Sequence, residues 1–151
     1  MPIPALDHHG LLPTGTHDCS ISEIEQLFCW NPHRVELISK LKDFLAQRWL
    51  PLGIQAPLWV DGSFTRKKDN PADIDVVVDV AHVPLADMGP VLALYCARDQ
   101  LKTDFSVDFW VKHPAFFLND LTSFFCYAGI KAAAELGIDS QQIKGILRVN
   151  P

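Results

Sequence analysis

The sequence predicts a single domain over residues 1–151 of mixed α/β (α+β) class, in which helices pack on one face of a small mixed β-sheet. Three observations support this fold class. The 151 residues are 48% hydrophobic, which suits one globular domain with a core. Alternating apolar residues predict strands over residues 57–61, 73–80 and 104–112. Apolar residues at helical spacing predict helices between these strands.

The N-terminal part is predicted to form an irregular arm followed by two helices. Residues 1–20 combine proline, glycine, histidine and threonine with few periodic apolar positions, which is typical of an arm or loop. Ser22 and Glu25 match the S-x-x-E capping box and predict a short helix over ISEIEQLF. Asn31 followed by Pro32 predicts the start of a second helix, which ends at Pro51. The apolar face of that helix is predicted to contain Val35, Ile38, Leu41, Phe44, Leu45 and Trp49.

The C-terminal part is predicted to add a polar connection and two further helical segments. Residues 62–70 form the polar connection between the first two strands. Residues 84–99 are moderately helical, with an interruption at Gly89-Pro90. Residues 114–136 are predicted to form a helix that is closed by Gly137.

Charge and cysteine content limit the classes of partner and compartment. The formal net charge of −5 argues against a protein that holds nucleic acid on a broad basic surface. The four cysteines show no C-x-x-C pairing, and no secretory leader opens the chain. No apolar run approaches the ~20 residues that a membrane span needs. We therefore expect a reduced, cytoplasmic protein without a membrane-inserted segment.

The most informative stretch is residues 58–75, LWVDGSFTRKKDNPADID, which places a Gly-Ser pair and two aspartates on either side of one connection. Because strand residues two apart share a face, Asp73 and Asp75 lie about 6–7 Å apart, a separation at which carboxylates can share or bridge metal ions. Asp108 lies on the polar face of the 104–112 strand and projects to the same side if the two strands are neighbours. This grouping predicts a divalent-metal site.

The predicted metal site suits nucleotidyl transfer, in which a hydroxyl attacks the α-phosphorus of a nucleoside triphosphate. Two Mg²⁺ (or Mn²⁺) ions about 3.5–4 Å apart stabilise both the attacking and the leaving oxygens in such reactions. Asp73 and Asp75 would bind both ions. Asp108 would complete the metal nearer the acceptor and help to take its proton.

A phosphate-binding turn is predicted beside the carboxylates. Gly62 lets main-chain amides approach a triphosphate, and the N–H and hydroxyl of Ser63 can donate to a phosphate oxygen. Lys67 or Lys68 could add a cation beside the β and γ phosphates. The same basic run, which begins at Arg66, could instead be a solvated loop.

Simpler interpretations of these residues stay open. The three carboxylates could be solvated side chains on a sheet face, although like charges this close repel unless a cation or a raised pKa compensates. The Gly-Ser pair alone is a common strand-to-helix turn. Asp61 and Asp104 could contact the metal-binding aspartates without binding the metal themselves. The favoured interpretation is that both are simple edge residues. Trp110 could stack on a base, but packing at an edge of the core is favoured.

The order of these motifs resembles a known signature. Gly62-Ser63, a nine-residue spacer, Asp73-Ile74-Asp75 and Asp108 on a later strand resemble the DNA polymerase β-like nucleotidyltransferase superfamily. Beyond this signature, LPTGTHDCSISEIEQLF, NPHR, WVDGSF and KGILRV are similar to a group of small, largely uncharacterised bacterial members. The resemblance implies a palm-like mixed sheet backed by helices, with the three carboxylates on its open face.

The resemblance also implies an activity and a partner. It implies a metal-dependent transferase that moves NMP from a nucleoside triphosphate, such as ATP, to a hydroxyl on protein, RNA or a small molecule. Larger members carry an extra domain that grips the base or the acceptor, and a chain of this length leaves no room for one. Some minimal members pair with a helical toxin that they modify with AMP, which suggests a toxin–antitoxin or phage-defence role. The alternative is a non-catalytic, nucleotide-sensing or partner-binding antitoxin-like module on the same fold.

Overall fold

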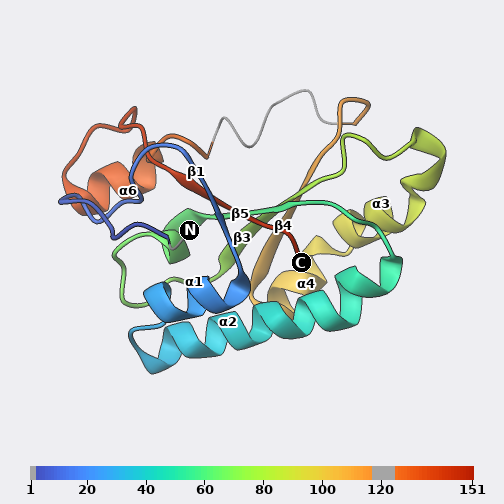
Figure 1. Ribbon diagram of the computed structural model, residues 1–151, viewed down its shortest axis with the longest axis horizontal. Helices are drawn as coiled ribbons and strands as arrows, with labels where there is room; N and C mark the ends of the chain where they lie inside the picture. Colours follow the sequence, from blue (N-terminus) through green and yellow to red (C-terminus); the bar gives the residue numbers. More distant parts are fainter. Residues whose placement is uncertain (1–2, 117–124) are drawn as a thin grey trace.

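A five-stranded mixed sheet organises the computed structural model, which describes residues 3–116 and 125–151 (Figure 1). The strand order across the sheet is β1-β5-β2-β3-β4. Strand β1 runs parallel to β5 and β3 runs parallel to β4, whereas β2 is antiparallel to both of its neighbours. The mixed α/β class predicted from the sequence is therefore confirmed. The strands are β1 (Thr16–Cys19), β2 (Leu58–Asp61), β3 (Ile74–Asp79), β4 (Val107–Lys112) and β5 (Ile146–Val149).

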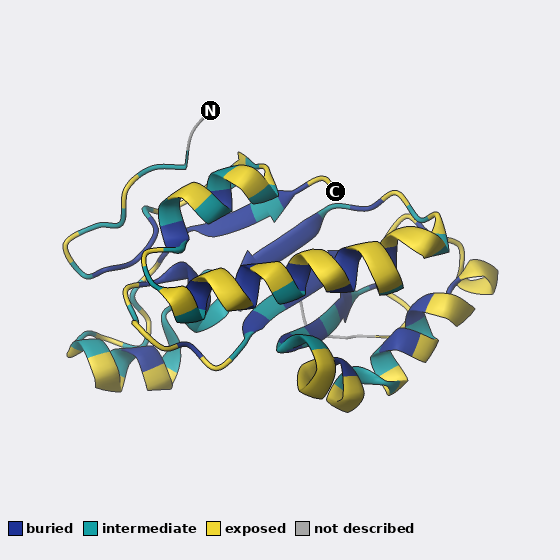
Figure 2. Cartoon of the chain, turned by 90° about the horizontal axis from the view of Figure 1, so that it is seen from below, coloured by how far each residue is buried: buried dark blue, intermediate teal, exposed yellow. Residues whose placement is uncertain are grey.

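Helices flank this sheet. In Figure 1, α1, α2 and α4 lie below the sheet and α6 lies above it at one end. Helix α2 crosses the sheet in Figure 2 with a buried stripe facing the strands and an exposed stripe facing solvent. The described α-helices are α1 (Ile21–Phe28), α2 (Pro32–Phe44), α3 (Gly89–Cys96), α4 (Arg98–Phe105) and α6 (Gly129–Leu136). Helix α2 continues through a π-helical turn (Leu45–Trp49) and a 3-10 turn (Leu50–Leu52), and further 3-10 turns are η3 (Gly62–Thr65) and η4 (Leu85–Asp87).

The main core lies between the sheet and helices α1 to α4, and it sets the face on which the aspartates lie. Apolar residues at alternate positions of β3 and β4 are fully buried in this core, as the sequence predicted. They are Ile74, Val76 and Val78 of β3 and Val107, Phe109 and Val111 of β4. Because side chains alternate along a strand, Asp75 and Asp108 lie on the opposite face. A smaller cluster of Trp59, Val77 and Ile146 occupies the rest of that face.

The prediction of an irregular arm over residues 1–20 is wrong for its last part. Residues Thr16–Cys19 form β1, which extends the sheet beyond β5. Four residues at a sheet edge, none of them fully buried, leave too little apolar alternation to indicate a strand.

The helix predicted over ISEIEQLF is confirmed, but its cap is not the predicted one. Ser20 is the N-cap residue and forms the capping box with Glu23, whose carboxylate accepts from the Ser20 N–H at 2.7 Å. The chain contains two overlapping S-x-x-E matches, and the pattern alone does not choose between them. Glu25 instead pairs with Lys42 of α2 at 2.7 Å.

The start of α2 is confirmed, while its buried face is shifted. Asn31 is the N-cap and accepts from the Arg34 N–H, and Pro32 follows in the first turn. Val35, which was predicted to face the core, is 47% exposed, and Arg34 is buried in its place. Pro51 lies inside the final 3-10 turn, and the left-handed Gly53 ends the segment.

Three helix boundaries in the C-terminal part were also predicted wrongly. Gly89-Pro90 starts α3 instead of interrupting a helix, because proline lacks the N–H that the first helical turn leaves unpaired. Of the helix predicted over 114–136, residues Gly129–Leu136 are helical, with Gly137 as the left-handed cap. Residues 114–116 and 125–128 are not helical, and residues 117–124 lie outside the described part. Residues 104–105, assigned to a strand, end α4.

In residues 3–116 and 125–151, no helix combines the length and the apolar character that crossing a membrane requires.

Candidate active site

A row of carboxylates crosses three adjacent strands at one end of the sheet. Asp61, the last residue of β2, is paired in register with Asp75 of β3. Asp75 is in turn paired with Asp108 of β4. Neighbouring strands lie about 4.8 Å apart, so residues in register bring their side chains together on one face. Asp73 immediately precedes β3 and shares the face of Asp75. The structure thus brings together the three aspartates that the sequence singled out, and it adds Asp61.

Burial and the neighbouring carboxylates both act on Asp75. Desolvation and then the negative charges of Asp73, Asp108 and Asp61, in that order, together raise the pKa of Asp75 to about 8. Asp75 also shares a hydrogen bond with the Asp108 carboxyl. At neutral pH and without a cation, the Asp75 carboxyl therefore carries a proton.

Asp61 is compensated by a buried cation. It is 1% exposed, and its Oδ1 forms an ion pair with the buried Lys144 ammonium, which enters from the segment before β5. The Thr65 hydroxyl lies 3.1 Å from the same oxygen. Within the described residues, Asp61 Oδ2 has no hydrogen-bond partner. Burial raises the pKa of Asp61, and the Lys144 ammonium opposes that rise. Asp61 is therefore no edge residue, contrary to the expectation from the sequence.

A second lysine lies at the outer end of the carboxylate row. The Lys102 Nζ of α4 is 3.0 Å from Asp73 Oδ2 and 3.9 Å from Asp108 Oδ2. The hydrogen bond to Asp73 is the main cause of a raised pKa at Lys102. Lys144 opens the KGILRV stretch, but no local pattern indicates the partner of Lys144 or of Lys102, because each lysine reaches the site through long-range packing. Sequence reasoning missed both.

Gly62 brings the chain against Asp75. Its φ of +82° lies in the left-handed region, and a Cβ at this position would overlap the Asp75 carboxylate. Ser63 follows in the 3-10 turn η3 and is half-buried. The predicted Gly-Ser turn therefore lies directly beside the carboxylates.

The two lysines predicted to contact phosphate differ in their surroundings. Lys68 Nζ is 3.1 Å from the Glu135 carboxylate of α6, and Arg66 donates to the same carboxylate at 2.6 Å. These two bonds, Arg66 first, lower the pKa of Glu135. The Lys67 side chain is exposed, and its main-chain N–H donates to the Gly10 carbonyl at 2.8 Å.

The comparison with known proteins covers this entire arrangement. A model described as a family of unknown function, DUF6932, matches residues 4–150. The chain belongs to this family. All the strands and all the residues of the carboxylate row lie inside the matched region, so they are part of what the family model describes. No curated protein and no solved structure matches the chain.

The donor set of this DUF6932 chain fits a divalent cation in its chemistry. Carboxylate oxygens are the ligands that Mg²⁺ and Mn²⁺ prefer, and the charges of Asp73, Asp108 and Asp61 add to desolvation in raising the pKa of Asp75. In the described part of the chain, no three His, Cys, Asp or Glu side chains are already placed around one ligand position. The cation that the structure places at this point is the Lys102 ammonium, 3.0 Å from Asp73 and 3.9 Å from Asp108.

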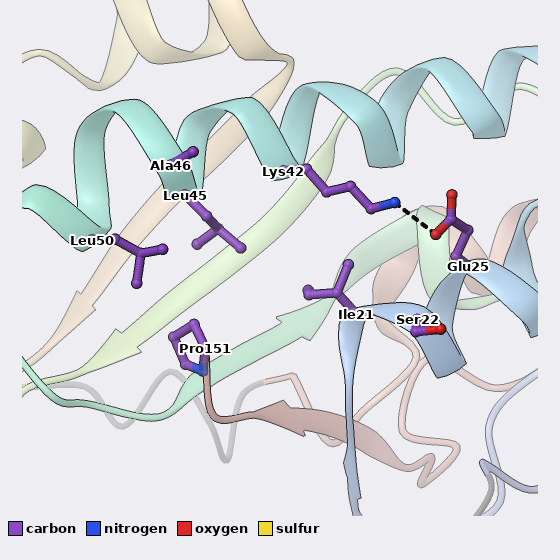
Figure 3. Close-up of a pocket in the computed structure, with 8 residues that line it drawn as sticks. All are labelled: Ile21, Ser22, Glu25, Lys42, Leu45, Ala46, Leu50 and Pro151. Carbon is purple, nitrogen blue, oxygen red and sulfur yellow. Dashed lines mark hydrogen bonds and ion pairs between the residues drawn. The ribbon is translucent and has the colours of Figure 1, made fainter.

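A groove of about 460 Å³ lies elsewhere, on the helical side of the sheet (Figure 3). Figure 3 shows mostly apolar side chains around it, together with the Lys42–Glu25 ion pair. Its lining consists of Ile21, Ser22, Glu25, Lys42, Leu45, Ala46, Leu50 and Pro151. None of these residues belongs to the carboxylate row, so the groove is separate from the candidate site.

The raised pKa of Asp75 predicts a pH-dependent stability. Between its unfolded pKa near 4 and its folded pKa of about 8, the folded state binds the extra proton, so stability falls as pH rises through this range. Without divalent cations, we expect wild type to lose about 2–5 kcal/mol relative to Asp75→Asn between pH 5 and pH 8. Urea unfolding at a series of pH values measures this difference. Parallel stability curves for the two proteins would contradict the assignment.

Because Gly62 packs against Asp75, alanine at position 62 is predicted to destabilise the fold and to disturb the site. Gly62→Ala combines a left-handed φ with overlap at the carboxylate, so we expect a loss of about 1–3 kcal/mol in unfolding free energy and weaker Mn²⁺ binding. Gly89→Ala is the matched control, because a Cβ there meets open space at an ordinary φ. Thermal unfolding and Mn²⁺ titration by electron paramagnetic resonance check both effects. Equal behaviour of the two variants would refute the close approach.

Proposed function

We propose that the chain is a metal-dependent nucleotidyltransferase, which transfers NMP from a nucleoside triphosphate to a hydroxyl acceptor. The observation that carries this proposal is the Asp75 carboxyl, held among other carboxylates directly beside the glycine turn at Gly62. A purely structural sheet gains nothing from gathering carboxyls where desolvation and mutual repulsion raise the pKa of one of them to about 8. Because Gly62 has no side chain, the phosphates of a substrate can approach the carboxylates at this turn.

Each carboxylate has a role in this proposal. Asp73, Asp75 and Asp108 would hold two Mg²⁺ (or Mn²⁺) ions. When bound, these ions neutralise phosphate charge and stabilise the attacking and leaving oxygens. Asp108 is the outermost member of the row, with a side chain that is 25% exposed, and it accepts the proton of the incoming hydroxyl. Asp61 stays paired with Lys144 and supports Asp75 from β2.

The phosphate groups of the substrate would lie along the connection after β2. Gly62 and Ser63 offer main-chain N–H groups and a hydroxyl there, and the exposed Lys67 supplies a cation. Lys68 adds a second cation once it leaves Glu135.

The acceptor in this proposal is a hydroxyl on a protein, an RNA or a small molecule. A protein acceptor is favoured, because a net charge of −5 gives no broad basic surface for nucleic acid. A helical toxin partner in the cytoplasm, within a toxin–antitoxin or phage-defence system, is the specific form of this proposal.

Label transfer tests the activity. The protein is incubated with each triphosphate labelled at its α-phosphate, with Mg²⁺ or Mn²⁺ and cell lysate. We expect transfer by wild type and a loss of at least about 100-fold in Asp73→Asn, Asp75→Asn and Asp108→Asn. Asp79→Asn is the control, because Asp79 lies on the same face of β3 but is paired with Lys112 at the other end. Transfer that persists in Asp75→Asn would exclude the assigned site, and a wild type that binds no triphosphate would exclude the class.

We predict that the Glu135 carboxylate weakens triphosphate binding. Glu135→Gln removes the negative charge that engages Arg66 and Lys68, so we expect about 3- to 10-fold tighter binding of a non-hydrolysable triphosphate with Mg²⁺. Glu36→Gln is the control, since it breaks only a surface pair with Lys40 on α2. Isothermal titration measures both affinities. Unchanged or weaker binding by Glu135→Gln would show that these cations do not face the phosphates.

One observation favours a second candidate, a non-catalytic module for nucleotide sensing or partner binding. Lys102 already supplies an ammonium to Asp73 and Asp108, so the cluster has an internal counter-ion. A module of this kind would bind its partner equally well in wild type and in Asp73→Ala/Asp75→Ala. It would show neither label transfer nor uptake of Mn²⁺.

A further inference from the structure

The segment between α1 and α2 holds the connection between β2 and β3. Trp30 donates from Nε1 to the Asp69 carboxylate at 3.3 Å, and Asn31 donates from its amide to the Asp69 carbonyl at 2.7 Å. The His33 ring is hydrogen-bonded to the Pro71 carbonyl, two residues before Asp73. Residues 38 or 39 positions apart in the sequence are thus hydrogen-bonded to one another.

Arg34 is the centre of this contact. It is fully buried, at 0% exposure, and the Trp30 ring stacks on its guanidinium with 3.7 Å to the ring centroid. In the described part of the chain, all the hydrogen bonds of this guanidinium go to main-chain carbonyls, at 2.6–3.4 Å. The accepting carbonyls are those of Phe28, Ser63, Phe64, Arg66 and Lys68.

These bonds fix the orientation of the connection. In a planar trans peptide the N–H points opposite to the carbonyl. Because the carbonyls of Ser63 and Phe64 point toward Arg34, the N–H groups of Phe64 and Thr65 point away from it. Successive N–H groups that face one way form the kind of concavity that binds anions.

Arg34 also places a positive charge beneath this connection. Desolvation lowers the pKa of the guanidinium to about 10, so it remains charged at neutral pH. A buried charge close to the Ser63 turn acts through a medium of low dielectric constant and favours an anion there. Arg34 itself cannot touch such an anion, because it is completely covered.

We propose that Arg34, assisted by Trp30 and His33, is a positioning residue for the phosphate-binding connection 62–71. Its planar guanidinium holds the carbonyls of the connection toward Arg34. It thereby orients the main-chain N–H groups that face phosphate, and it fixes the course of the chain toward Asp73. The inference rests on the proposed function in one respect, namely that this connection binds phosphate.

The test compares Arg34→Lys with wild type by two measurements. Lysine keeps the charge but loses the fork that spans several carbonyls. Amide hydrogen exchange reports the order of residues 62–71 without any ligand. Titration with Mg²⁺ and inorganic tripolyphosphate reports phosphate binding without a base. We expect exchange over 62–71 to accelerate about 10-fold and the tripolyphosphate Kd to rise about 10- to 100-fold.

Ile38→Val is the control for a merely structural role. It weakens the core contact of the same helix, but its side chain has no polar atom that could hold the carbonyls of the connection. We expect it to lower the melting temperature while leaving local exchange and tripolyphosphate binding at wild-type values. If Ile38→Val and Arg34→Lys change the Kd alike, the positioning role is overturned.

The remaining outcomes separate the inference from the proposed function. Unchanged exchange over 62–71 in a folded Arg34→Lys protein overturns the inference alone. Accelerated exchange with a wild type that binds no tripolyphosphate supports the holding role and overturns phosphate binding. If Arg34→Lys does not fold, Trp30→Ala and His33→Ala take its place, because both side chains reach the surface. An increase of at least about threefold in exchange supports the inference, and none overturns it.

Discussion

The repulsion among carboxylates around Asp75 is the constraint on which the rest of this site depends. Asp61 and Asp108 are fixed beside Asp75 by strand register, so the sheet itself imposes the crowding. Two ammonium groups offset it from outside the three strands that carry these aspartates, Lys144 before β5 and Lys102 on α4. The order β5-β2-β3-β4 is therefore needed electrostatically as well as for packing, because it brings the buried Lys144 beside β2.

The sequence predicted the parts of the site that follow from local periodicity. Alternation along β3 placed Asp73 and Asp75 on one face, and alternation along β4 gave Asp108 its face. It did not predict that Asp61 is buried, because a carboxylate at a strand end resembles an edge residue until the lysine that pairs with it is known. Lys102 was missed for the same reason. Ion pairs between distant segments leave no local pattern, whereas periodic burial does.

Arg34 illustrates a different limit of sequence reasoning. A helical pattern assigns the buried face by hydrophobicity, and Val35 therefore seemed the core residue. The chain instead buries Arg34, because main-chain carbonyls satisfy the whole guanidinium fork and Trp30 covers its face. The exposed Val35 and the shifted helix face follow from that choice. The irregular connection 62–71 accordingly has a defined course, although residues 62–70 have the composition of a flexible loop.

The balance of charge indicates how the site would respond to a cation. With every group ionised, four carboxylates face two ammonium groups, which leaves two negative charges. In the absence of a divalent ion, a proton on Asp75 removes one of them, and desolvation together with the neighbouring charges raises its pKa to about 8. A single divalent cation would balance both and expel that proton, so protons and metal compete for the same carboxyl. Lys102 competes at the outer end, where its half-exposed chain can withdraw with little loss. Under the proposed function, the site would therefore change from an internally compensated cluster to a metal-binding one, and the buried Lys144 would keep Asp61 paired in either state.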